Sequence, residues 1–197
     1  MLHAGLVISG LVIGFVLGTL GEYWIHRGMH HRWVGRFLIK RHGDHHVEGL
    51  GQGVLQEFRD YAAGALLAAA LFVAPDYYFV TGGWFAIPAV AGAAIHAIFA
   101  AWCHQAQHED PRLLFWQSAT PVHFVHHKRN QPGHNYGISV DWWDRVFGTY
   151  RPEPNWRALV DPAAPRRPWW RLDWADHRPS VRGAAGSTRA RQFGSGR

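Results

Sequence analysis

Three long apolar stretches dominate the pattern of hydrophobic and polar positions along the 197-residue chain. Residues 2–25 carry one acidic residue, Glu22, and are long enough to cross a hydrocarbon core of about 30 Å at about 1.5 Å per residue. Residues 61–80 and 84–102 form a hairpin-like pair whose single charge is Asp76, with interruptions at Pro75-Asp76 and at residues 81–83. A helix of a soluble protein normally carries a charged face. The pattern therefore predicts an all-α integral membrane protein with about three spans.

A cleavable signal peptide is the alternative reading of the first apolar stretch. No basic residue precedes that stretch, no A-x-A site follows it, and it continues directly into histidines. A retained membrane helix is therefore the preferred reading.

The basic residues are divided unevenly between the apolar and polar regions. All twenty Lys and Arg fall in residues 26–59 and 104–197, and none falls in residues 1–25 or 61–103. The positive-inside rule predicts that both basic regions face the cytoplasm, which places the N-terminus and the turn between the second and third spans outside. The cytoplasmic face should attract anionic headgroups and acidic proteins. The arginines are not interleaved with aromatic residues along a basic domain, so we expect no nucleic-acid partner.

The composition changes near residue 151, after which Arg, Pro, Trp, Ala and Gly dominate. We expect two parts: residues 1–150, which contain the spans and a cytoplasmic cap, and a basic tail over residues 151–197 that is disordered at its end. Tryptophans among arginines suit either an anchor at the membrane interface or a loosely ordered chain, and the sequence leaves both open. These residues are Trp169, Trp170 and Trp174 with Arg166, Arg167 and Arg171.

Ten of the fifteen histidines form four groups with the spacing of ligands on helices. Two groups are H-x-x-x-H pairs and two are H-x-x-H-H triads, so their imidazoles project from one face or adjoining positions of a helix. Each group follows or flanks an expected span on the basic side. The ten residues are His26 and His30; His42, His45 and His46; His104 and His108; and His123, His126 and His127.

This number of imidazoles points to metal binding. Ten nitrogens exceed the coordination sphere of one ion and suit two ions with roughly four to six ligands each. Imidazole binds Zn, Fe, Cu and Ni alike. Two iron ions explain best why so large a site stands at a membrane, and zinc is the alternative in the isolated protein. The single cysteine, Cys103, excludes Cys₄ sites, and no dinucleotide fingerprint, P-loop or hydrolase motif is present.

Several other residues keep two readings. His96, within the third span, is either functional or a packing histidine, because ionisable residues in spans are candidates for function. His134 is either an extra ligand or an orienting group, and His31 should point away from the first histidine pair. Acids near the ligands either orient imidazoles or are simply solvated; they are Glu22, Asp44, Glu109 and Asp110.

The order of these motifs resembles the fatty acid hydroxylase/sterol desaturase superfamily over about residues 20–150. The similar segments are Y-W-I-H-R-G-M-H at residues 23–30, the H-x-x-H-H boxes at 42–46 and 123–127, and N-Y-G with W-D-R-V-F-G-T within 135–149. The additional pair, His104 and His108, is most similar to the histidine layout of fatty acid 2-hydroxylases. Many members of the superfamily have four spans, whereas three are readable here.

The resemblance implies a membrane di-iron enzyme that uses O₂ to hydroxylate or desaturate a lipid C–H site, with the ten histidines as ligands. Electrons would come from an external donor, such as a ferredoxin or a cytochrome b5-like protein, because the chain has no flavin, haem or iron–sulfur motif. We expect a lipid hydroxylase with a fatty acyl or sterol-like substrate. The alternatives are a lipid or sterol desaturase or a carotenoid hydroxylase on the same site, and a metal-binding or metal-transporting membrane protein.

Overall fold

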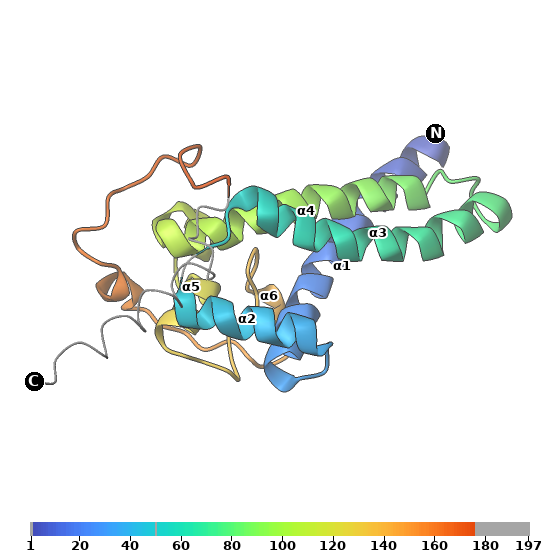
Figure 1. Cartoon of the computed structure of the whole chain (residues 1–197). Helices are drawn as coiled ribbons and strands as arrows, with labels where there is room; N and C mark the ends of the chain where they lie inside the picture. The colour runs from blue at the N-terminus through green and yellow to red at the C-terminus, as the bar shows by residue number, and fades with distance from the viewer. Residues whose placement is uncertain (1, 50, 176–197) are drawn as a thin grey trace, which may run out of the picture.

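The computed structural model of the chain describes residues 2–49 and 51–175. In these residues all regular structure is helical, which confirms the all-α prediction. The elements are α1 (Leu2–His31), α2 (Arg36–Glu48), α3 (Val54–Phe79), α4 (Ala86–Glu109), α5 (Val122–Lys128) and α6 (Trp142–Val146), with 3-10 helices η1 (Pro111–Leu113), η2 (Phe115–Gln117) and η3 (Trp156–Leu159). Helices α1, α3 and α4 form a rod, and the shorter helices gather in a head at one end of it (Figure 1). The end of the tail, predicted to be disordered, and His177 lie outside the described residues.

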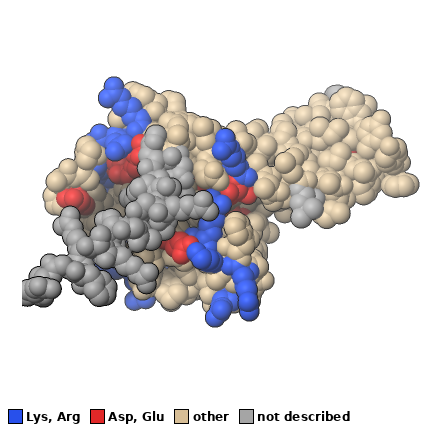
Figure 2. All heavy atoms as spheres, viewed as in Figure 1, with Lys and Arg blue, Asp and Glu red and all other residues tan. Residues whose placement is uncertain are grey.

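Two helices of the rod, α1 and α4, are each long and apolar enough to cross a membrane. Helix α3 makes a third if Val54–Leu66 and Ala69–Phe79 form one span with a bend of 43°. Two to three membrane-length helices agree with the expected number. Lys, Arg, Asp and Glu gather on the head, whereas the visible face of the rod is almost free of them (Figure 2).

Helices α1 and α4 approach closely because glycine occupies their contact. Gly10 and Gly14 of α1 lie against the backbone of α4 around Ala89, and Gly92 of α4 lies against the backbone of α1. A Cβ atom at any of the three would collide with the partner helix. Small residues promote helix association in lipid for this reason.

The turn between α3 and α4 covers residues 80–85, and Pro75 lies within α3 instead of ending it. Asp76 stabilises this turn from the last part of the helix. Its carboxylate accepts hydrogen bonds from the Thr81 hydroxyl at 2.7 Å and from the backbone N–H of Ala86 at 3.0 Å. Asp76, the charge that interrupts the apolar pattern, therefore accepts hydrogen bonds from groups of the turn that would otherwise lack an acceptor.

Part of the chain after residue 150 packs on the head. Trp156 is 1% exposed and packs with Phe124 and Val125 of α5. Leu172 is 4% exposed and belongs to a cluster with Cys103 of α4. The predicted division of the chain at residue 151 stays a prediction.

Candidate metal centre

Nine of the ten predicted histidines converge in the head as two groups. The first group consists of His26 and His30 from α1, His42 and His46 from α2, and His126 from α5. The second group consists of His45 from α2, His108 from α4, and His123 and His127 from α5. Within each group, one ring nitrogen per residue lies within 4.8 Å of all the others. Nitrogens bound at about 2.1 Å on opposite sides of one ion lie about 4.2 Å apart. Each group therefore has nearly the size of one coordination sphere.

The two groups adjoin because α2 and α5 contribute to both. His46 of the first group stacks on His127 of the second, with ring centroids 4.0 Å apart and an interplanar angle of 10°. His42 and His46 are one helical turn apart and share a face, and His45 is turned toward the second group. Each H-x-x-H-H triad thus bridges the two groups.

His104 is the predicted ligand that belongs to neither group. Its ring centroid lies 4.5 Å from that of His123 and 4.9 Å from that of His45, so the ring borders the second group. Its Nδ1 atom lies 3.0 Å from Oε1 of Glu57, which is buried in the first turn of α3. Whether His104 binds a metal stays a prediction. Glu57 was missed by the sequence reasoning, because nothing in its spacing relates it to a histidine on another helix.

Backbone carbonyls orient two rings of the first group. Nδ1–H of His26 donates to the carbonyl of Tyr136 at 2.6 Å, and Nδ1–H of His126 donates to the carbonyl of His134 at 2.8 Å. Because a carbonyl only accepts, Nδ1 carries hydrogen in both rings, which leaves Nε2 as the ligand atom. Nε2 of His126 indeed lies 2.9 Å from Nε2 of His30.

Burial favours the neutral form of the imidazoles in the two groups. Burial, with neighbouring imidazoles as a further cause, lowers the pKa of His42 to about 2, that of His126 to about 3 and that of His46 to about 4. The same causes hold the pKa of His45 and the pKa of His123 well below the usual value. Neutral imidazole is the form that binds metals, since the protonated ring has no free lone pair.

Hydrogen bonds alone do not satisfy the ring nitrogens. Nε2 of His42 lies 2.8 Å from Nε2 of His30 and 3.0 Å from Nε2 of His46, although each neutral ring has only one N–H. Both ring nitrogens of His123 and Nε2 of His127 are buried without a hydrogen-bond partner among the described residues. A metal ion in each group would accept the converging lone pairs. The residues therefore fit metal ions.

The loop that follows α5 supplies both orienting carbonyls. Asn135 has a φ of +60°, a left-handed conformation that Asn adopts more readily than most residues. Its Oδ1 accepts a hydrogen bond from the backbone of Arg151 at 2.9 Å. Asp144 of α6 accepts hydrogen bonds from the N–H groups of Tyr136 at 2.8 Å and Gly137 at 2.7 Å. These contacts hold the Asn-Tyr-Gly segment against the first group.

Glu22 ties the same loop to α1. Its side chain is 3% exposed, and Oε1 accepts hydrogen bonds from the backbone N–H groups of Ile138 at 2.7 Å and Ser139 at 3.0 Å. Its Oε2 lies 3.2 Å from Nε2 of His96. Glu22 thus bonds the loop whose Tyr136 carbonyl orients His26, and His96 is its hydrogen-bonded partner outside both histidine groups.

His31 and the other acids near the ligands also lie outside both groups. His31 lies beside the hydroxyl of Tyr136, with 2.9 Å from its Nε2 to the hydroxyl oxygen. Asp44 is an exposed acid paired with a lysine, and Glu109 and Asp110 are paired with arginines. Among the described residues, the ion-pair partners of these three acids are therefore lysine and arginine side chains and not histidine rings.

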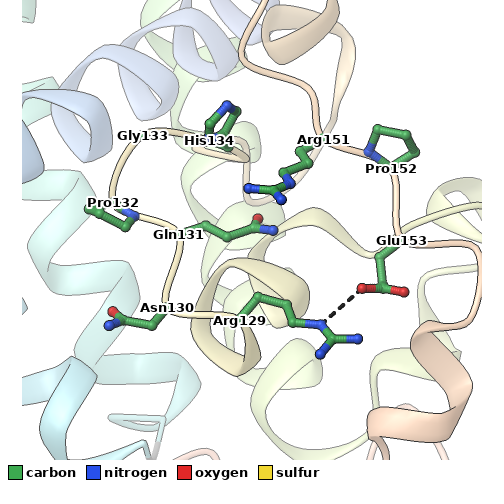
Figure 3. A pocket seen from close by; sticks show the side chains of 9 residues that line it. All are labelled: Arg129, Asn130, Gln131, Pro132, Gly133, His134, Arg151, Pro152 and Glu153. Atoms are coloured by element: carbon green, nitrogen blue, oxygen red, sulfur yellow. Dashed lines mark hydrogen bonds and ion pairs between the residues drawn. The ribbon is translucent and has the colours of Figure 1, made fainter.

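A polar pocket of about 530 Å³ opens on the head near the first group (Figure 3). The loop from Arg129 to His134 forms one side and the segment from Arg151 to Glu153 forms the other, with 2.9 Å between Nε of Arg129 and Oε2 of Glu153. His134 offers its backbone carbonyl to His126 and is not a member of either group. One hydrogen bond therefore separates the pocket wall from the first group.

Comparison with models of known protein families identifies a match to this sequence. The model of the family described as fatty acid hydroxylase matches residues 11–149, a range that contains all ten predicted histidines and the Asn-Tyr-Gly segment. Searches of curated proteins and of solved structures found no match.

Proposed function

The chain belongs to the fatty acid hydroxylase family, and on that premise we propose that it is an O₂-dependent hydroxylase of a membrane lipid. The family implies an oxidoreductase of the lipid hydroxylase or desaturase type. The proposed reaction inserts one oxygen atom from O₂ into an aliphatic C–H bond of a fatty acyl or sterol-like chain. The observation that carries this proposal is the pair of adjoining, all-histidine groups at one end of membrane-length helices.

We propose two iron ions as the metals, one in each group. Iron bound there supplies the electron-transfer chemistry that activates O₂ for attack on a C–H bond. The first group offers five imidazoles and the second offers four, with His104 adjacent to the second. Because imidazole binds zinc as well, zinc is expected to replace iron in protein that is isolated without it.

Residues of the chain orient the imidazoles, favour their neutral form and set the place of the first group relative to the hydrocarbon core. The carbonyls of Tyr136 and His134 orient two rings, and burial lowers the pKa of the imidazoles in the two groups, such as His42 and His126. His26 follows Leu2 by 24 residues, roughly 36 Å along a helix, so the first group lies just beyond a hydrocarbon core of about 30 Å. A lipid chain between the helices would reach the groups without leaving the bilayer.

An acidic, soluble electron donor is the protein partner that we propose, such as a ferredoxin or a cytochrome b5-like protein. The polar pocket is the proposed docking place, since it is lined by Arg129, Arg151 and His134 and lies one hydrogen bond from His126 (Figure 3). Charge complementarity accelerates this kind of encounter. The basic head is proposed to face the cytoplasm, in accordance with the positive-inside rule.

Metal transport is the less well supported alternative. Transport sites lie near the bilayer midplane, whereas helices α2 and α5, which contribute to both histidine groups, lie at one end of the rod (Figure 1). His96, near the middle of α4, bonds to Glu22 and Ser139 and joins neither group. Desaturation and carotenoid hydroxylation would use the same groups, and the reaction product distinguishes them.

Isotope labelling tests the proposed reaction. Purified protein in lipid, with iron and a reducing system, is incubated with ¹⁸O₂, and product lipids are analysed by mass spectrometry. One ¹⁸O atom per product is expected, and none when only the water is labelled. His126→Ala should abolish the product, and His3→Ala should not, because His3 stacks on Trp84 far from the head. Label from water would indicate hydrolysis or hydration, and an unlabelled alkene would establish a desaturase.

A further inference from the structure

The segment Pro165–Trp174, which we call the strap, lies beyond the part of the chain that the family model matches. It crosses the start of α3, where backbone N–H groups have no partner within the helix. The carbonyls of Asp173 and Trp174 accept hydrogen bonds from the N–H groups of Val54 and Leu55, each at 3.0 Å. The strap thus completes the N-terminus of a rod helix.

The strap is also fixed to the end of α4. Glu109 accepts a hydrogen bond from the backbone N–H of Asp173 at 2.7 Å, and its second oxygen lies 2.7 Å from Nη1 of Arg167. Leu172 is buried beside α4, and the indole of Trp102 donates to the carbonyl of Trp169 at 3.0 Å. These contacts hold the strap in one place at the junction of rod and head.

The outward side of the strap is aromatic and basic. Trp169 is 60% exposed, Trp170 57% and Trp174 42%. Arg166 and Arg171 are also exposed. Tryptophan prefers the boundary between hydrocarbon and headgroups, and arginine beside it attracts anionic phosphate groups. This composition fits a lipid surface better than water.

The depth of the strap along the rod agrees with such a boundary. The far end of the rod exposes Tyr77, Tyr78 and Trp84, which mark one interface. Trp102 follows Ala86, at the start of α4, by 16 residues, roughly 24 Å along the helix. Glu109, to which the strap is also bonded, follows Ala86 by 23 residues, roughly 35 Å. The contacts of the strap at Trp102 and Glu109 therefore lie on either side of the boundary of a hydrocarbon core about 30 Å thick.

We propose that the strap lies in the headgroup layer of the bilayer, with its tryptophans at the hydrocarbon boundary and its exposed arginines toward anionic phosphates. The strap continues the membrane-facing surface of α3 and α4, to which it is bonded, and this continuity favours lipid as the occupant over a second copy of the chain. The strap then fixes how deeply the rod sits and holds the end of α4, which carries His104 and His108. This inference does not depend on the reaction proposed for the head.

Spin labels at single cysteines test the depth. The full chain with Cys103→Ser and Trp170→Cys is labelled and reconstituted in vesicles of phosphatidylcholine and phosphatidylglycerol. Collision of the label with O₂, which concentrates in hydrocarbon, is compared with collision with a water-soluble nickel chelate. Leu17→Cys, on the exposed side of α1, is the hydrocarbon reference, and Gly133→Cys, in the loop of the polar pocket, is the water reference.

We expect the O₂-to-nickel ratio at residue 170 to be several-fold above that at residue 133 and below that at residue 17. Trp169→Cys repeats the measurement at a residue that bonds to Trp102 through its backbone carbonyl, which the substitution keeps. A ratio equal to that at residue 133 at both positions would overturn the proposal. So would a label shielded from both reagents, because that result indicates a protein contact such as a second copy of the chain.

Discussion

Replacing Glu22 with alanine should weaken metal binding without removing any histidine. The carboxylate accepts hydrogen bonds from two buried backbone N–H groups, those of Ile138 and Ser139, and contacts His96. Hydrogen bonds to a charged group contribute about 1.5–3 kcal/mol each, so Glu22→Ala should destabilise the fold by about 3–6 kcal/mol. At about 2–4 °C per kcal/mol for a chain of this size, the lower limit corresponds to about 6–12 °C in melting temperature.

The effect on metal follows from the position of the released loop. Ile138 lies two residues after Tyr136, whose carbonyl orients His26. Loss of a group that orients a ligand typically lowers metal affinity about 10–100-fold. The assay is competition for bound metal by a chelator, measured on protein in detergent, with melting temperature recorded on the same samples. Glu22→Gln keeps an oxygen acceptor for both N–H groups, so we expect a much smaller loss of metal affinity and a much smaller fall in melting temperature.

Asp76→Ala is the matched control for a general loss of stability. Asp76 is also a buried carboxylate that accepts a backbone N–H, but it serves the turn at the far end of the rod. The Asp76→Ala variant should have a lower melting temperature and an unchanged chelator competition. The reasoning is refuted if Glu22→Ala retains metal as the unaltered protein does, or if Asp76→Ala loses metal to the same extent.

Three further predictions concern protons, electrons and topology. The metal-free protein should lose stability as pH falls from about 6.5 to about 4. The lowered pKa values of His42, His46 and His126 keep these rings neutral in the folded state, whereas the unfolded chain takes up protons in this range. Melting temperatures that stay constant over this range would contradict the prediction. Arg151→Glu should lower turnover with an acidic protein donor about tenfold at low salt and leave turnover with a small chemical reductant unchanged, and equal losses with both reductants would exclude the docking place. A reporter that works only in the cytoplasm should be active when fused after Arg151 and inactive within the turn at residues 80–85, and the reverse pattern would place the head outside.

The rod was predictable because each of its features is local in the sequence. Apolar stretches of membrane length and a single acid at the turn each report on one helix or one turn. The ends of the helices were less predictable. Helix α3 begins at Val54 and α4 continues to Glu109, well beyond the apolar windows, because their polar ends pack within the head. Packing against other segments, not hydropathy, decides those boundaries.

The division of the histidines into two groups could not be predicted, because histidines of one sequence motif belong to different groups in the structure. Spacing shows which imidazoles share a helix face, and the first pair, His26 and His30, does remain together. Each triad is divided instead: His45 leaves its neighbours for the second group, and His126 joins the first. The division depends on how α2 packs near α1 and how α5 packs near α4, which no local pattern records. The same packing brings the ring of His46 onto that of His127. A change in the angle of α2 or α5 would therefore alter both groups together. We expect any change that removes metal binding from one group to remove it from the other.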